Sequence, residues 1–145
     1  MKTLTISMLA ALAIACAAHA KLGDTFTQSR NVYGDPFTME AVPGKTDEFD
    51  AVYKVNRYGE ELVIQEWYLD YKSVSIVYYW PGTHDDFTPG QIADFVAENL
   101  PADLREQSTW KVAHQTATEI DWLVGNYDVA HLLKNPQFSI TEKGK

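Results

Sequence analysis

The chain has 145 residues, a formal net charge of −8 at pH 7 and a single cysteine, Cys16. An acidic chain repels phosphate backbones, so the composition argues against nucleic-acid binding. A lone cysteine cannot form an intramolecular disulfide, so stability must come from an apolar core, which a chain of this length can build as one domain.

The first residues have the pattern of an export signal rather than of a folded segment. Lys2 is followed by an apolar stretch, and Ala18-His19-Ala20 is a small-x-small cleavage site, so residues 1–20 are expected to be a signal peptide. The apolar stretch is shorter than the roughly 20 residues of a membrane span. We therefore expect residues 21–145 to form a single exported domain that is periplasmic or secreted and has no membrane span.

Cys16 leaves a second interpretation of this leader open. The run Ala13-Ile14-Ala15-Cys16 resembles the lipobox of bacterial lipoproteins, in which the cysteine is lipidated and becomes the new N-terminus. Lipidation would tether the protein to the outer membrane. Otherwise Cys16 is removed with the signal.

The first half of the exported chain predicts one short helix followed by three strands. Capping side chains precede large residues at helical spacing between Phe26 and Tyr33, and a glycine and a proline then stop the helix. Three runs rich in Val, Ile, Tyr and Trp follow a polar turn and predict an antiparallel meander at residues 51–57, 61–69 and 73–80.

The alternation of apolar residues predicts the register of the second hairpin. A four-residue loop around its turn pairs Trp67 with Val74. This register turns Tyr68 and Tyr79 to the face opposite the core and places Tyr71 at the turn.

The second half predicts another helix and four short strands. Thr88 begins a Thr-Pro-Gly-Gln capping box, and Pro101 ends the helix. The strands are expected beyond a polar linker at residues 110–116, 119–124, 128–133 and 138–141. The order predicts an α+β fold of antiparallel meander sheets with two short helices, in which residues 21–82 and 83–145 would be copies of one helix-plus-meander unit.

The opening of the exported chain resembles that of small exported bacterial domains. Leu22-Gly23-Asp24-Thr25, the short helix and Tyr33-Gly34-Asp35-Pro36 are similar to the start of the β-lactamase-inhibitor-protein-like repeats and of the small lipoprotein of the outer-membrane β-barrel assembly machine. Thr88-Pro89 with its helix, followed by Trp110, looks like uncharacterised exported bacterial proteins. This resemblance implies a binding or scaffolding domain without a catalytic centre.

Two groups of residues are candidates for metal or proton chemistry. In His84-Asp85-Asp86 an imidazole stands beside two carboxylates, although the aspartates could equally serve the N-terminus of the following helix. His114 and His131 could meet across the sheet with Asp121 or Glu119 as a third ligand. The alternative is that each histidine is partly buried and satisfied by one hydrogen bond.

Hydrolytic chemistry has little support in the exported part of the chain. It contains neither a Gly-x-Ser-x-Gly motif nor a cysteine nucleophile. Glu66 and Asp70, taken as solvent-facing, could serve glycoside cleavage as a carboxylate pair. We expect no cofactor.

The aromatic hairpin carries the functional prediction. Tyr68, Tyr71 and Tyr79 would form an exposed platform for a protein or glycan partner in the envelope, unless other elements cover Tyr68 and Tyr79. We therefore expect a non-enzymatic exported binding or assembly module. The alternatives are a small carbohydrate-active or other hydrolytic enzyme and an envelope lipoprotein with a structural role.

Overall fold

A computed structural model describes residues 20–82 and 84–144 and contains, within them, two α-helices, two short 3₁₀ turns and one sheet of eight strands. The 3₁₀ turns are Ala102–Leu104 and Gln107–Thr109. The helices and strands, in chain order, are α1 (Phe26–Tyr33), β1 (Thr38–Ala41), β2 (Phe49–Arg57), β3 (Glu60–Leu69), β4 (Lys72–Tyr79), α2 (Pro89–Asn99), β5 (Lys111–Gln115), β6 (Glu119–Val124), β7 (Tyr127–Leu132) and β8 (Gln137–Glu142).

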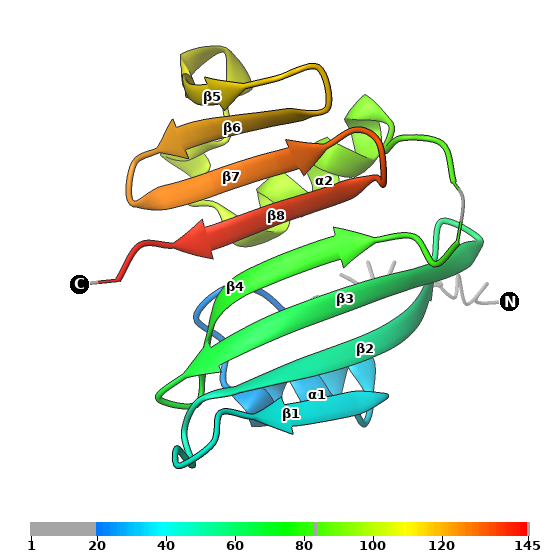
Figure 1. Cartoon of the computed structure of the whole chain (residues 1–145), viewed down its shortest axis with the longest axis vertical. Coiled ribbons are helices and arrows are strands. Elements are labelled where there is room, and N and C mark those ends of the chain that lie inside the picture. The colour runs from blue at the N-terminus through cyan, green and yellow to red at the C-terminus, as the bar shows by residue number, and fades with distance from the viewer. Residues whose placement is uncertain (1–19, 83, 145) are drawn as a thin grey trace, which may run out of the picture.

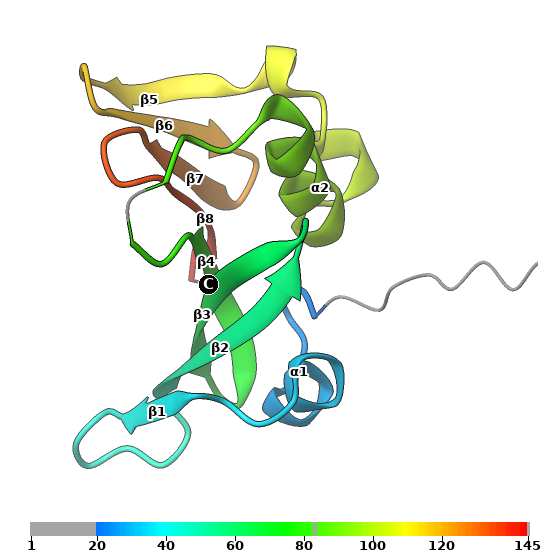
Figure 2. The ribbon, with the colours of Figure 1, turned by 90° about the vertical axis from the view of Figure 1, so that its right-hand side faces the viewer.

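All strands are antiparallel to their neighbours and follow the order β1-β2-β3-β4-β8-β7-β6-β5 (Figure 1). Strand β4 pairs with β8 from Ser75 opposite Thr141 to Tyr79 opposite Gln137, so the two meanders join into one continuous sheet. Figure 2 shows both helices on the same face of this sheet. The predicted α+β class is confirmed, with a single sheet in place of separate meanders.

Both helices begin with the same side-chain arrangement. The Thr25 hydroxyl accepts a hydrogen bond from the Gln28 N–H at 3.3 Å, and the Gln28 side chain accepts one from the Thr25 N–H at 2.7 Å. Thr88 and Gln91 repeat this pattern at 3.2 and 2.8 Å. These capping boxes satisfy backbone donors that would otherwise lack partners. Both predicted helices and the predicted strands are confirmed to within about two residues.

The sequence did not predict strand β1, which pairs with the start of β2 at the edge of the sheet. All four of its residues are exposed. A strand with both faces open to solvent has no alternation of buried and exposed residues, which is the pattern that reveals strands in a sequence. Edge strands of this kind are therefore found only through their pairing.

The predicted register of the β3–β4 hairpin is wrong by one residue. Asp70 and Tyr71 form a two-residue turn with φ angles of 52° and 60°, although neither is the glycine that such a turn favours. The ladder then shifts between Trp67 and Tyr68, so Trp67 lies opposite Ser75 rather than Val74. As a consequence Tyr79 shares a face with Val63 and Trp67, whereas Tyr68 lies on the other face of β3 with Ile64 and Glu66, toward the helices.

Helix α2 covers the junction between β4 and β8. Its Phe95 ring stacks on Tyr78 of β4, with centroids 4.0 Å apart, and lies 6.0 Å from Phe138 of β8. Asn99 of the same helix donates a hydrogen bond to the Tyr78 hydroxyl at 2.7 Å and accepts one from the Leu22 N–H at 3.1 Å. One helix therefore holds both central strands and the start of the described chain.

Helix α1 packs on β2 and β3 through aromatic contacts. The Phe26 ring lies edge-on to Phe49 and Tyr68, at centroid distances of 5.1 and 5.6 Å. Tyr33 contacts Tyr53 at 5.2 Å. The core is therefore an aromatic layer between the two helices and one face of the sheet.

Replacing Phe95 with alanine should lower the free energy of unfolding by about 3–5 kcal/mol, because the residue is fully buried against two strands. Urea unfolding followed by circular dichroism measures the change. Phe37→Ala is the control, since Phe37 is 65% exposed and its Lys54 contact contributes about 1 kcal/mol or less. Equal effects of the two substitutions would contradict the position given to α2.

Candidate functional site

The structure separates the three tyrosines that were predicted to form a platform. Tyr68 is fully buried and is covered by Phe26 of α1. Tyr79 is half-buried on the opposite face of the sheet, and Tyr71 is 51% exposed at the hairpin turn. Tyr68 therefore belongs to the core, because the helices cover the face of β3 that carries Ile64, Glu66 and Tyr68, which is the face expected to lie opposite the core. Partner binding by Tyr71 and Tyr79 stays a prediction.

The face of the sheet without helices carries aromatic and aliphatic side chains of its own. Trp67 lies between Glu66 and Tyr68, which are both buried on the helix side, so its side chain is on the helix-free face. Tyr79 pairs with Val63 on the same face. Trp67 and Tyr79 are half-buried, and Val63 is 3% exposed. The centre of this face is thus apolar.

The apolar surface continues toward both ends of the helix-free face. Leu69 at the end of β3 is 38% exposed, and Leu123 of β6 is 41% exposed. Antiparallel sheets that face water on one side usually carry polar residues there. This face therefore carries more large apolar side chains than is usual for a sheet surface that faces water.

Acidic side chains outnumber basic ones around this surface. Asp121 and Asp128 line a hollow of about 400 Å³ on β6 and β7. Within the described residues, Asp121 Oδ1 is buried without a hydrogen-bond partner. The strand registers place on the helix-free face the acids Glu40, Asp50, Glu61, Glu119, Asp121 and Asp128, and the bases Lys54, Lys72 and Lys111. Lys143, just beyond β8, pairs with Asp128 at 3.1 Å.

The side chains of His84-Asp85-Asp86 do not converge on one point. The imidazole of His84 packs by Trp80, and its Nδ1 lies 3.5 Å from the Glu60 carboxylate. Asp86 turns instead toward His131. Across residues 20–82 and 84–144, no group of three or more His, Cys, Asp and Glu side chains is arranged to hold a metal ion.

Asp86 and His131 form a hydrogen-bonded pair. The Nε2 of His131 lies 2.6 Å from Asp86 Oδ1, which also accepts a bond from the Phe87 N–H at 2.7 Å. Because a carboxylate only accepts, Nε2 carries the proton of this bond. His114 lies opposite Asp121 on the helix-free face, whereas His131 is on the helix side, so the expected meeting of the two histidines does not occur.

Glu66 is fully buried beneath α1 rather than facing solvent. The Tyr68 hydroxyl donates to its Oε2 and lies 3.3 Å from the Tyr53 hydroxyl. Oε1 of Glu66 has no hydrogen-bond partner in the part of the chain that the structure describes. Burial raises the pKa of Glu66 above its ordinary value. Asp70 is exposed at the hairpin turn, so the two carboxylates do not share a cleft.

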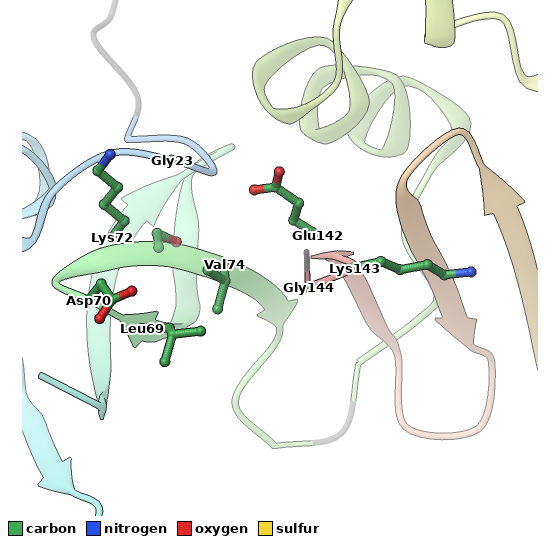
Figure 3. Close-up of a pocket in the computed structure, with 9 residues that line it drawn as sticks. Gly23, Leu69, Asp70, Lys72, Val74, Glu142, Lys143 and Gly144 are labelled. Atoms are coloured by element: carbon green, nitrogen blue, oxygen red, sulfur yellow. The ribbon is translucent and has the colours of Figure 1, made fainter. Parts of the chain in front are cut away.

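A surface hollow of about 580 Å³ lies at the end of the β4–β8 junction. It forms where Gly23 and Asp24, rather than β8, hydrogen-bond to Ser73 at the start of β4. Figure 3 shows Lys72 and Lys143 pointing away from each other on opposite sides of this hollow. Its charged groups therefore do not converge, and the hollow lacks the geometry of a catalytic site.

Residues 1–19, which include Cys16, lie outside the described residues. Signal cleavage and lipidation therefore remain predictions. None of the helices in the described ranges is long and apolar enough to cross a membrane.

Comparison of the chain with protein-family models, curated proteins and solved structures found no match in any of the three. The resemblance of its opening to small exported bacterial domains therefore stays a prediction.

Replacing Glu66 with glutamine should stabilise the protein increasingly as pH rises. A raised pKa means that the folded state binds more protons than the unfolded state. The wild type therefore loses stability as the pH rises from about 4.5, the ordinary pKa of the carboxyl, through the raised pKa of Glu66 in the folded protein. Glutamine keeps an acceptor for Tyr68 and removes the charge. Urea unfolding at several pH values measures the difference between variant and wild type.

The matched control is Glu61→Gln on the same strand, where the exposed carboxylate lies 3.6 Å from Lys54. This change should produce no growing stabilisation with pH. A Glu66→Gln variant that is less stable than the wild type at pH 8 would show that the charge of the buried carboxylate does not destabilise the folded protein.

Proposed function

We propose that the protein is a non-enzymatic exported binding module that holds a protein partner on the helix-free face of its sheet. The observation that carries this proposal is the position of both helices on one face, so that within residues 20–82 and 84–144 no helix covers the other face (Figure 2). Trp67 and Tyr79 at its centre and the exposed Leu69 and Leu123 give that face the aromatic and aliphatic character of a protein interface.

The charge of the helix-free face favours a partner with basic residues. Six acids and four lysines, including the Lys143 that pairs with Asp128, surround the apolar centre, and the whole chain carries a net charge of −8. Asp121, whose Oδ1 has no hydrogen-bond partner among the described residues, lines a hollow that can receive a lysine or arginine side chain, whereas the neighbouring Asp128 already pairs with Lys143 at 3.1 Å. Complementary charge of this kind speeds association and orients the partner. A protein with basic groups around an apolar patch therefore fits better than a neutral glycan.

We further propose that the fold is a duplicated helix-plus-meander unit, residues 21–82 and 83–145. The strand order is mirrored about the β4–β8 junction, and each half has one helix followed by four strands. Both helices also begin with a Thr-x-x-Gln capping box. Joining two such units edge to edge doubles the width of the helix-free face and places its aromatic centre beside the junction.

The proposed cellular compartment is inferred from the leader, residues 1–20. Its positive start, apolar stretch and cleavage site support export to the periplasm or beyond, with lipidation at Cys16 as the alternative. A periplasmic or lipidated protein would meet its partner in the bacterial envelope.

Substitution of both Trp67 and Tyr79 with alanine should weaken partner binding by at least about 30-fold, because central aromatic residues dominate interface energetics. The purified protein is cross-linked to the exported fraction of its native host, the captured protein is identified, and its affinity is measured by calorimetry. Asp121→Asn should weaken binding less and reduce its salt dependence.

The matched control is the double variant Met39→Ala and Val112→Ala, which removes side chains that are 57% and 55% exposed on the helix side of the two edge strands. It should bind like the wild type. Circular dichroism establishes that each variant is folded. A captured partner that binds the Trp67 and Tyr79 variant as tightly as the wild type would refute the proposal.

A further inference from the structure

A second concave site lies on the helix side of the sheet, remote from the helix-free face. It has a volume of about 450 Å³ and lies between the start of α2 and strands β6, β7 and β8. Four of its ten lining residues are the aromatic Phe87, Trp110, Trp122 and Phe138. Pockets of this size and apolar character are typical of small-molecule sites.

The aromatic wall is held in place by contacts that do not involve a ligand. Trp110 and Trp122 pack edge to face with centroids 5.7 Å apart, and the Trp110 indole N–H donates to the Leu104 carbonyl at 2.8 Å. Phe138 is fully buried, and Phe87 is 4% exposed. Because these rings are already packed and bonded, the pocket is formed before any ligand arrives.

One carboxylate is fixed at this aromatic wall. Asp86 lines the pocket, and both hydrogen bonds that the structure gives its side chain, from His131 and from the Phe87 N–H, end on Oδ1. Its second oxygen, Oδ2, is therefore available to a ligand, and the side chain is 40% exposed. Among the described residues that line the pocket there is no lysine or arginine to neutralise it.

We propose that this pocket binds a small organic cation with an apolar body, such as a quaternary ammonium compound. Aromatic rings attract such cations through their negative faces, and the attraction strengthens when the site excludes water. Asp86 supplies the counter-charge, and the net charge of −8 of the chain raises the local concentration of cations. An anion would be repelled by the carboxylate, which no lysine or arginine of the lining compensates, and a purely apolar ligand would leave its Oδ2 unused.

The His131 pair explains how the carboxylate keeps its position. The His131 side chain is 9% exposed and lies with its ring 6.1 Å from Phe138, so packing fixes the imidazole. The imidazole in turn holds Asp86 Oδ1 at 2.6 Å. His131 is thus a positioning residue, and Asp86 is the group that contacts the cation.

The test titrates the purified protein with choline and with its neutral isostere, in which a carbon atom replaces the ammonium nitrogen. Tryptophan fluorescence and the indole N–H signals in NMR spectra report binding at Trp110 and Trp122. Choline should bind at least about 10-fold more tightly than the isostere, since both fill the same volume and differ only in charge. Equal affinity for the two compounds, or no response to choline at about 10 mM, would overturn the proposal.

Variants locate the charge within the pocket. Asp86→Asn keeps an acceptor for His131 and should reduce the affinity for choline about 10-fold while leaving the isostere unaffected. The matched control is Asp85→Asn, the exposed neighbour, which should change neither affinity. Equal losses in the two variants would mean that general charge attraction, rather than this pocket, explains the binding. This site stands apart from the helix-free face, so its test and that of the proposed function are independent.

Discussion

The pairing of β4 with β8 is the constraint on which the rest of the structure depends. It joins two antiparallel meanders into one sheet, and the Ser75 and Thr141 hydroxyls lie 2.8 Å apart across it. Without this pairing, each meander would have an open central edge, which invites association with other chains. Phe95 of α2 packs over Tyr78 and Phe138, one from each strand, so the helix fixes the junction from one side. With both helices on this side, no helix of the described residues covers the other face of the sheet.

Local features of the fold could be predicted because they depend on neighbouring residues. The capping boxes at Thr25 and Thr88 locate the helices, and apolar runs locate the longer strands. The hairpin register was missed because Asp70 and Tyr71 both take positive φ angles, for which the sequence gives no signal in the absence of glycine. The β4–β8 pairing joins segments separated by a helix and three strands, and no local pattern encodes it.

The candidate sites show the same division between local and long-range information. Glu66 is predicted to face solvent, yet it is fully buried, whereas His131 is 7% exposed with one hydrogen bond to Asp86, as the alternative interpretation of that residue predicts. The one available signal was their spacing, since Glu66 alternates with Ile64 and Tyr68, and His131 follows Val129 by two residues. Asp86 meets His131 only because the segment before α2 returns to the sheet over β7. Its pairing with His131 therefore needed the tertiary structure, whereas its presence in a site-like cluster was visible in the sequence.

The central claim is that a single sheet, continuous through β4 and β8, presents one helix-covered and one helix-free face. Amide hydrogen exchange tests it most directly, because the amides of β4 that point toward β8 are protected only if the two strands are paired. The structure predicts that these amides exchange as slowly as those of β3 and far more slowly than the outward amides of the edge strand β5. Rapid exchange along β4, as in β5, would mean that the two meanders are separate sheets and would contradict the account.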